Sequence, residues 1–261
     1  GTGGRGMIEF LSITPEIDGW MFILFTVLAC FTAAFGVVAG LGGGIVLIGF
    51  MATVFPPVAL IPVHGVVQAG SNVTRTIIAH KLVIKSAILP FAVGALIGSA
   101  IGGKIVVSIP VALLQAILGV FMLYVCFAPK ITAGIPTGKR FFILGTIGAF
   151  ISMFIGATGT ILAPWVRGVS DDRRVFVATH AAIMMFIHGL KVVVFAVLGF
   201  EFFTYLPLMV AMVSAGFLGN WIGFKLLNMM NEEVFKRVFQ VMLVILSIRL
   251  LWAAATRAGY I

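Results

Sequence analysis

Apolar runs of about 20 residues follow one another along almost the whole chain, separated by short stretches of Pro, Gly or charged residues. About 20 apolar helical residues span the roughly 30 Å hydrocarbon core of a bilayer. Hydrophobic residues make up 61% of the 261 positions, and no stretch is left over for a soluble domain. The sequence therefore predicts an all-α polytopic membrane protein whose chemistry takes place inside the bilayer.

Polar residues recur in this chain at a constant offset of 116 positions. The first set, Gly40, Gly43, His64, Asn72 and Arg75, returns as Gly156, Gly159, His180, His188 and Lys191. A duplicated unit that places polar groups inside apolar helices is typical of membrane transporters. We therefore expect an N-terminal extension, a first transmembrane repeat, a cytoplasmic linker, a second repeat and a C-terminal tail, at residues 1–19, 20–127, 128–139, 140–256 and 257–261.

Each repeat divides into five apolar segments, bounded by Pro, Gly or charge clusters. We expect them at 20–39, 44–55, 58–80, 86–107 and 110–127, and again at 140–156, 159–168, 174–198, 205–227 and 232–256. The second segment of each repeat is too short to cross upright, since twelve helical residues rise only about 18 Å. Glycine-rich turns precede both short segments and allow a sharp reversal of the backbone. We expect two broken or re-entrant hairpins that meet near the midplane, each followed by three transmembrane helices; whether the short segments re-enter or cross at a tilt stays open.

The distribution of basic residues supports a hairpin that returns to its own side. One face then collects eleven Lys and Arg residues: Lys81, Lys85, Lys130, Lys139, Arg140, Arg167, Arg173, Arg174, Lys225, Lys236 and Arg237. The other face collects three, Arg5, Lys104 and Arg257. Because cytoplasmic loops are enriched in Lys and Arg, this bias places both termini outside. An odd number of crossings per repeat follows, so the second repeat is inverted relative to the first.

Small residues predict close helix contacts in the fourth segment of each repeat. Gly98 and Gly102 match Gly219 and Gly223 at an offset of 121. Such GxxxG steps favour close helix packing in membranes, and we expect these two segments to pack tightly.

A polar stripe runs along the third segment of each repeat. His64, Gln68, Asn72 and Arg75 are spaced i, i+4, i+8 and i+11, which confines them to a helical sector of about 80°. In the second repeat His180, His188 and Lys191 occupy the same sector, and Met184 stands at the position of Gln68. A polar sector on a helix in hydrocarbon should face a cavity or a partner helix.

The two cations of this stripe have no acidic partner inside the predicted helices. All eight acids fall in predicted loops or at helix ends: Glu9, Glu16, Asp18, Asp171, Asp172, Glu201, Glu232 and Glu233. The missing counter-charge is then a bound anion or solvent ions in a wet cavity. Helix N-termini at Gly43, Gly44 and Gly159 would add backbone N–H groups, and Thr158 and Thr160 could donate hydroxyls.

Other readings of the same residues stay open. Arg75 and Lys191 lie two or three turns from the ends of their helices, so either could snorkel to the interface. His64 and His180 could simply tie two helices together through a hydrogen bond. No helix has the i, i+4 His pair with nearby acids that a metal site requires, so we expect no metal and no cofactor.

At these residues the chain resembles the TauE/SafE sulfite exporter family, also called the toluene-sulfonate uptake permeases. The resemblance rests on the glycine-rich "GVVAGLGGGIVLIGF", the helix that follows it, and the diverged second copy "ISMFIGATGTILAPWV", and it covers residues 20–256. It implies transport of sulfite, thiosulfate, sulfonates or related small anions across a bacterial inner membrane, with periplasmic termini. The stretches "VHGVVQAGSNVTRTIIAHK" and "THAAIMMFIHGLK" are more polar than the corresponding family segments, which leaves the substrate open.

The sequence thus predicts a secondary carrier for a small anion, of the sulfite, thiosulfate or sulfoacetate type, working by alternating access around a midplane cationic site. The alternative is a passive anion channel. An enzyme is not expected, because HExxH and GxSxG are missing. The lipid bilayer and the anion are the expected partners, nucleic acid is not, and coupling to protons through the histidines, coupling to sodium and a homodimer all stay open.

Overall fold

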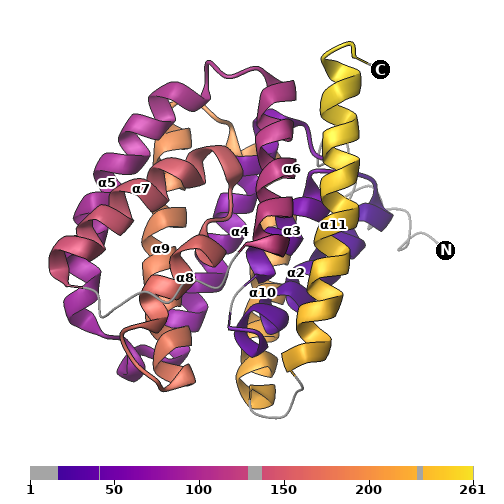
Figure 1. The fold of residues 1–261 in the computed structure, drawn as a ribbon. Helices are drawn as coiled ribbons and strands as arrows, with labels where there is room; N and C mark the ends of the chain where they lie inside the picture. Colours follow the sequence, from indigo (N-terminus) through magenta and orange to yellow (C-terminus); the bar gives the residue numbers. More distant parts are fainter. Residues whose placement is uncertain (1–16, 41, 129–136, 228–231, 261) are drawn as a thin grey trace.

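The computed structural model describes residues 17–40, 42–128, 137–227 and 232–260 (Figure 1). Most of the expected N-terminal extension and most of the linker lie outside the described residues, as do Arg5, Lys130, Glu9 and Glu16. The side chains of Glu232 and Lys236 lie outside them as well.

The described chain is a succession of helices and turns. The first half holds α2 (Gly19–Val38), α3 (Gly43–Met51), α4 (Pro57–Ile78), η1 (His80–Leu82), α5 (Lys85–Val106) and α6 (Val111–Phe127). The second half holds α7 (Gly138–Ile155), α8 (Gly159–Arg167), α9 (Arg173–Val197), η2 (Phe202–Tyr205), α10 (Leu206–Leu226) and α11 (Glu232–Arg257). Six spans among them are long and apolar enough to cross a membrane; they belong to α2, α5, α7, α9, α10 with η2, and α11. The expected all-α polytopic membrane class is confirmed.

Nine of the ten expected segments agree with a helix to within two residues at each end. The exception is 44–55, because α3 ends at Met51 and the next four residues form turns. Pro56 limits how far the helix can extend, since a proline disfavours helical backbone at the residue before it, here Phe55. The ring of Phe55 instead packs edge-on against Phe25 of α2, with centroids 5.4 Å apart.

That contact shows α3 folding back along α2 as a hairpin. The reversal uses backbone conformations that glycine adopts without strain: Gly40 has φ 79° and Gly42 has φ 95°. In the second half Gly156 ends α7 with φ 74°, and α8 begins three residues later. Both α3 and α8 have nine residues, so neither reaches across a bilayer upright.

The two halves interlock rather than standing side by side. The helix pair α2–α10 joins the two halves, and so do α5–α7, α4–α9 and α6–α11. Figure 1 shows α5 and α7 together at one edge of the molecule and α6 and α11 at the other. Exchanging the halves turns the α2–α10 pair into the α7–α5 pair, so the contacts follow the sequence repeat.

The GxxxG glycines make close contacts, but not between α5 and α10. A Cβ at Gly98 or Gly102 would press on the backbone of α7, and one at Gly219 or Gly223 on the backbone of α2. Both segments therefore pack tightly, as expected, but against different partners: α5 packs against α7, and α10 packs against α2. Each glycine face packs against the first helix of the opposite half.

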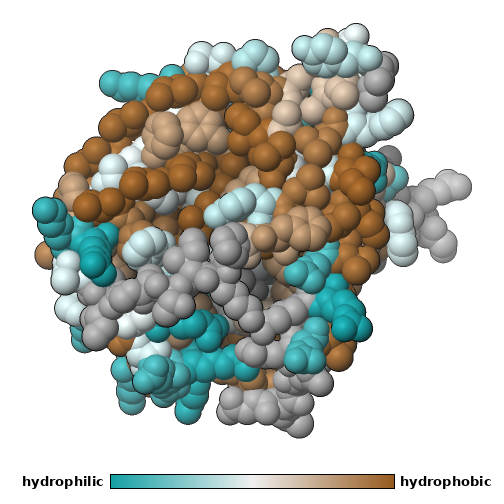
Figure 2. Space-filling view, in the orientation of Figure 1, coloured by the Kyte–Doolittle hydropathy of each residue, from teal (hydrophilic) through white to brown (hydrophobic). Residues whose placement is uncertain are grey.

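The outer surface is apolar where lipid would lie. Large side chains such as Leu89, Ile147, Val210 and Trp252 are more than half exposed. Figure 2 shows hydrophobic residues across the middle of one face and hydrophilic residues gathered mainly toward its lower end. Several of the most polar side chains, in contrast, are buried inside the helix bundle.

Candidate functional site

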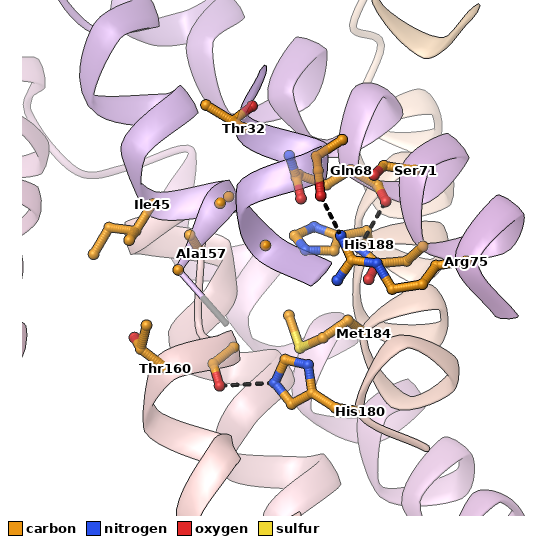
Figure 3. Close-up of a pocket in the computed structure, with 17 residues that line it drawn as sticks. Thr32, Ile45, Gln68, Ser71, Arg75, Ala157, Thr160, His180, Met184 and His188 are labelled. Atoms are coloured by element: carbon orange, nitrogen blue, oxygen red, sulfur yellow. Dashed lines mark hydrogen bonds between the residues drawn. The ribbon is translucent and has the colours of Figure 1, made fainter. Parts of the chain in front are cut away.

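A cavity opens where the N-termini of α3 and α8 approach the middle of α4 and α9. Its volume is about 40 Å³, and one buried water needs roughly 10 to 15 Å³ on a comparable measure. It therefore has room for a few waters or one small polyatomic ion. In Figure 3 Gln68, Ser71, Arg75 and His188 lie above His180 and Met184 in the view.

Two helix ends present backbone donors to this cavity. Among the described residues the first hydrogen bond at the start of α3 runs from Val46 N to Gly42 O; Gly43, Gly44 and Ile45 precede it, so their N–H groups have no acceptor inside the helix. At α8 the first bond runs from Ile161 N to Thr158 O, which leaves the N–H groups of Gly159 and Thr160. Thr160 also brings a buried hydroxyl that makes no hydrogen bond in the described structure. Unpaired N–H groups at the positive end of a helix dipole favour an anion.

Arg75 of α4 supplies a full positive charge to the same cavity. Its side chain is 7% exposed, so it does not snorkel to the interface. Its Nε and Nη2 donate to Asn220 Oδ1 of α10 at 3.3 and 3.1 Å, and Nη2 lies 3.5 Å from Ala33 O of α2. Asn220 is held in turn by donating from Nδ2 to Ser71 O and Oγ, at 2.7 and 3.2 Å. All these partners are neutral oxygens, so nothing in this network cancels the charge.

No acidic side chain of the described chain is buried with Arg75. Those that the structure describes are exposed: Asp18, Asp171, Asp172, Glu201 and Glu233. A buried cation without an acidic partner is costly, and it attracts an anion into its cavity.

Lys191 of α9, the counterpart of Arg75, is buried completely and lies outside the cavity lining. Its Nζ donates to Gly156 O at 2.7 Å and lies 3.4 Å from His188 Nδ1. Its stem passes Gly65 of α4, where a Cβ would meet Lys191 Cδ at 3.2 Å. The snorkelling alternative is therefore wrong for Lys191 too, but the ammonium stands behind His188 and not in the cavity.

The first histidine of each polar stripe links a long helix to one of the two short half-helices, α3 and α8. His64 Nε2 donates to Gly44 O and His180 Nε2 donates to Gly159 O, both at 2.8 Å. The hydrogen-bond tie weighed from sequence is thus present in both halves. Their Nδ1 atoms are buried and make no hydrogen bond in the described structure.

The cavity brings together most residues expected from sequence. Its lining includes Gly43, Gly44, Gln68, Asn72, Arg75, Gly159, Thr160, His180 and His188. His64, Thr158 and Lys191 are buried close to these elements but do not line it. Asn72 donates from Nδ2 to Gln68 O, one turn earlier on α4, at 2.8 Å.

Sequence reasoning missed the residues that hold Arg75. Asn220 is fully buried on α10, and Ser71, Thr32 and Ala33 line the cavity. Asn220 carried a usable signal, because it is a polar residue on the glycine face of an apolar helix, directly after Gly219. In the described part of the chain no three His, Cys, Asp or Glu side chains cluster as metal ligands would.

Comparison with protein families matches residues 25–250 to one family, Sulfite exporter TauE/SafE. The chain belongs to the TauE/SafE family. The matched region contains both hairpins, both polar stripes and Asn220. No curated protein and no solved structure matches. Membership confirms the resemblance seen in the glycine-rich hairpins and makes this TauE/SafE chain a membrane transporter.

Proposed function

We propose that this protein is a secondary carrier for a small sulfur-containing oxyanion or organosulfonate, of the sulfite, thiosulfate or sulfoacetate type. One observation carries the proposal: the buried guanidinium of Arg75 reaches a small cavity, and its hydrogen-bond partners among the described residues are all neutral oxygens. The anion would complete the charge balance of the cavity. The family description names the same class of cargo.

The geometry around the cavity suits an oxyanion in particular. Donors converge from different directions: the N-terminus of α3, the N-terminus of α8 and the Arg75 fork. A tetrahedral or pyramidal oxyanion presents several acceptor oxygens at once, and charge-assisted hydrogen bonds to them are stronger than neutral ones. The cavity volume of about 40 Å³ fits an inorganic ion or the head of a sulfonate in this conformation.

Alternating access is supported by the way the halves interlock. The cavity lies between the two half-helices, and the pairs α2–α10 and α5–α7 connect opposite halves around it. An inverted repeat that rocks one bundle against the other around a fixed site works with such pairing. Exposed basic residues at the ends of α5, α7, α8 and α9 (Lys85, Lys139, Arg140, Arg167 and Arg174) support a cytoplasmic location for that end, in a bacterial inner membrane with periplasmic termini.

Substitution of Arg75 by Gln tests the proposal most directly. We expect uptake of thiosulfate into proteoliposomes to fall about 10- to 100-fold, since a hydrogen bond to a charged group contributes roughly 1.5 to 3 kcal/mol. Gln can still bond to Asn220, so the helices should stay packed, which size-exclusion chromatography checks. The control is Lys81→Gln, which removes an exposed cation and should leave uptake unchanged. Equal uptake by the Arg75 variant and the control would sink the proposal.

A carrier and a passive channel are separated by counterflow. Vesicles preloaded with unlabelled thiosulfate should accumulate labelled thiosulfate transiently if the protein alternates between two faces. A channel dissipates the gradient without such an overshoot. Uptake with no overshoot would contradict the carrier and favour a channel, while leaving the proposed anion site in place.

A further inference from the structure

The cations at corresponding positions of the two repeats differ in what they touch. Arg75 faces the cavity, whereas Lys191 lies one layer back, with His188 between it and the cavity. Lys191 therefore makes no direct hydrogen bond to an ion in the cavity, and the group between its ammonium and that ion is His188. This arrangement makes the protonation of His188 depend on Lys191.

The hydrogen bonds decide which nitrogen of His188 carries its proton. An ammonium group has three donors and no acceptor, so a protonated Lys191 meets His188 Nδ1 only if that atom offers a lone pair. A neutral imidazole then has its proton on Nε2. His188 lines the cavity, and among the described residues its ring is hydrogen-bonded at Nδ1, to Lys191 Nζ. In this state the ring offers an N–H donor to an anion.

Loss of one proton from the Lys191–His188 pair switches His188 to its other tautomer. A neutral Lys191 amine has a lone pair, which can accept from His188 Nδ1–H while the amine still donates to Gly156 O. Nε2 then holds a lone pair, which repels the oxygen of an anion in the cavity. The two tautomers of His188 therefore correspond to high and low affinity for the anion.

We propose that Lys191 stores the proton that accompanies the anion and that His188 passes this proton between the cavity and Lys191. A proton from the cavity forms a bond to Nε2, the bond between Nδ1 and its proton breaks, and that proton forms a bond to Nζ. One proton is taken up in total, and the ring ends neutral with its donor toward the anion. Lys191 is thus a positioning residue, and anion and proton travel in the same direction. This inference rests on the proposed function, because it needs an anion in the cavity.

Few other charged or titratable side chains lie near the Lys191–His188 pair. Among the helices packed against α9, the titratable or charged side chains facing the pair are His64 and Arg75 of α4; the rings of His64 and His188 meet edge-on with centroids 5.9 Å apart. The remaining charged groups of those elements are exposed at helix ends: His80, Lys81, Lys85, Lys104, Lys139, Arg140 and Arg167. No described carboxylate is close enough to take the proton instead.

Thiosulfate binding to the purified full chain, measured by calorimetry in buffers of different ionisation enthalpy, tests the proposal. Thiosulfate does not itself protonate near neutral pH, so any proton taken up belongs to the protein. We expect the wild type to take up about one proton per anion, and its Kd to rise about tenfold per pH unit where the unloaded Lys191 is neutral. Binding without proton uptake at every pH from about 6 to 9 would overturn the coupling and leave the anion site intact. Absence of binding would instead overturn the proposed function itself.

Two variants separate coupling from binding. Lys191→Arg keeps a permanent donor behind His188, so it should bind thiosulfate within about tenfold of the wild type but take up no proton. His188→Gln can accept from Lys191 through its amide oxygen and offer an N–H group to the cavity, so it should also bind thiosulfate. Lys191 remains titratable in this variant, so its proton uptake at equilibrium should stay near the wild-type value. A Lys191→Arg variant that binds thiosulfate and still takes up about one proton contradicts the proposal.

A spectroscopic measurement on the wild type keeps the test independent of variant folding. In protein labelled with ¹⁵N-histidine, the His188 signals are those missing from the spectrum of His188→Gln. If that variant does not fold, they are the signals left after single substitutions of His64, His80 and His180 have assigned the other three histidines. With thiosulfate bound they should report a protonated Nε2 and an unprotonated Nδ1. A proton on Nδ1 in the bound state would overturn the proposal.

Discussion

The two repeats place equivalent residues in different surroundings, and Arg75 and Lys191 show this most clearly. Arg75 crosses to the other half, where Asn220 of α10 holds its guanidinium against the cavity. Lys191 stays within its own half, on Gly156 O and beside His188. The sequence repeat thus places two cationic stripes in the chain, and the fold gives them different partners. The difference fits one stripe that binds the anion and one that responds to protons.

The half-helix starts at Gly43 and Gly159 offer the sharpest test of how far the halves have diverged. A Cβ at Gly43 would overlap Thr32 O on the backbone of α2, which cannot yield without moving the hairpin. At Gly159 the nearest atom is His180 Cε1 at 3.0 Å, in a side chain that can shift. We expect Gly43→Ala to destabilise the protein by about 3 kcal/mol and Gly159→Ala by about 1 kcal/mol or less.

Thermal unfolding of the two variants in the same detergent checks this ranking. Similar melting temperatures would show that α3 and α8 are seated equally tightly, against the close approach seen only at α3. The added methyl group of the Gly159 variant also displaces the His180 ring, which lines the cavity. Its free energy of thiosulfate binding should therefore change by more than its free energy of unfolding.

The next largest effect concerns Asn220 and its counterpart Ser99. Asn220→Ala removes the acceptor of two Arg75 hydrogen bonds and leaves a buried guanidinium without that partner. We expect a loss of about 2 to 3 kcal/mol in stability, the scale of hydrogen bonds to charged groups. Within the described part of the chain Ser99 Oγ bonds to the carbonyls of Ala95 and Leu96, both in its own helix, so Ser99→Ala should cost less than about 1 kcal/mol.

Chemical or thermal denaturation measures the stability loss. Repeating the measurement with thiosulfate present gives a second readout. If Asn220 only holds Arg75, a saturating anion should recover part of the lost stability by pairing with the guanidinium. Equal losses for the two alanine variants would show that Asn220 matters for helix packing alone.

Local sequence signals predicted much of this fold. Helix boundaries follow from apolar runs that end at glycine, proline or charge, and two of the positive φ angles fall at the repeated Gly40 and Gly156. The polar stripe of α4 faces the interior, as expected of a polar face that would otherwise lie against lipid.

Long-range packing decided what sequence reasoning could not reach. Arg75 and Asn220 are 145 residues apart, and only the α4–α10 contact brings them together. The position of Lys191 behind His188 likewise depends on the glycine turn at Gly156, whose carbonyl holds the ammonium. Spacing along a helix gives the face of a residue but not its depth relative to a cavity.

The smallest expected effect comes from making the two stripes alike. Gln68 and Met184 occupy corresponding positions on α4 and α9, and both line the cavity. Met184→Gln would add an amide donor opposite Arg75 without changing charge or much volume. A neutral hydrogen bond contributes about 0.5 to 1.5 kcal/mol, so we expect thiosulfate to bind about two- to tenfold more tightly, measured by calorimetry. The isosteric control Met184→Leu should bind as the wild type does; if both variants lose affinity equally, the thioether itself contacts the anion, and the apolar residue in the second stripe is part of the site rather than a position that lost its polar group.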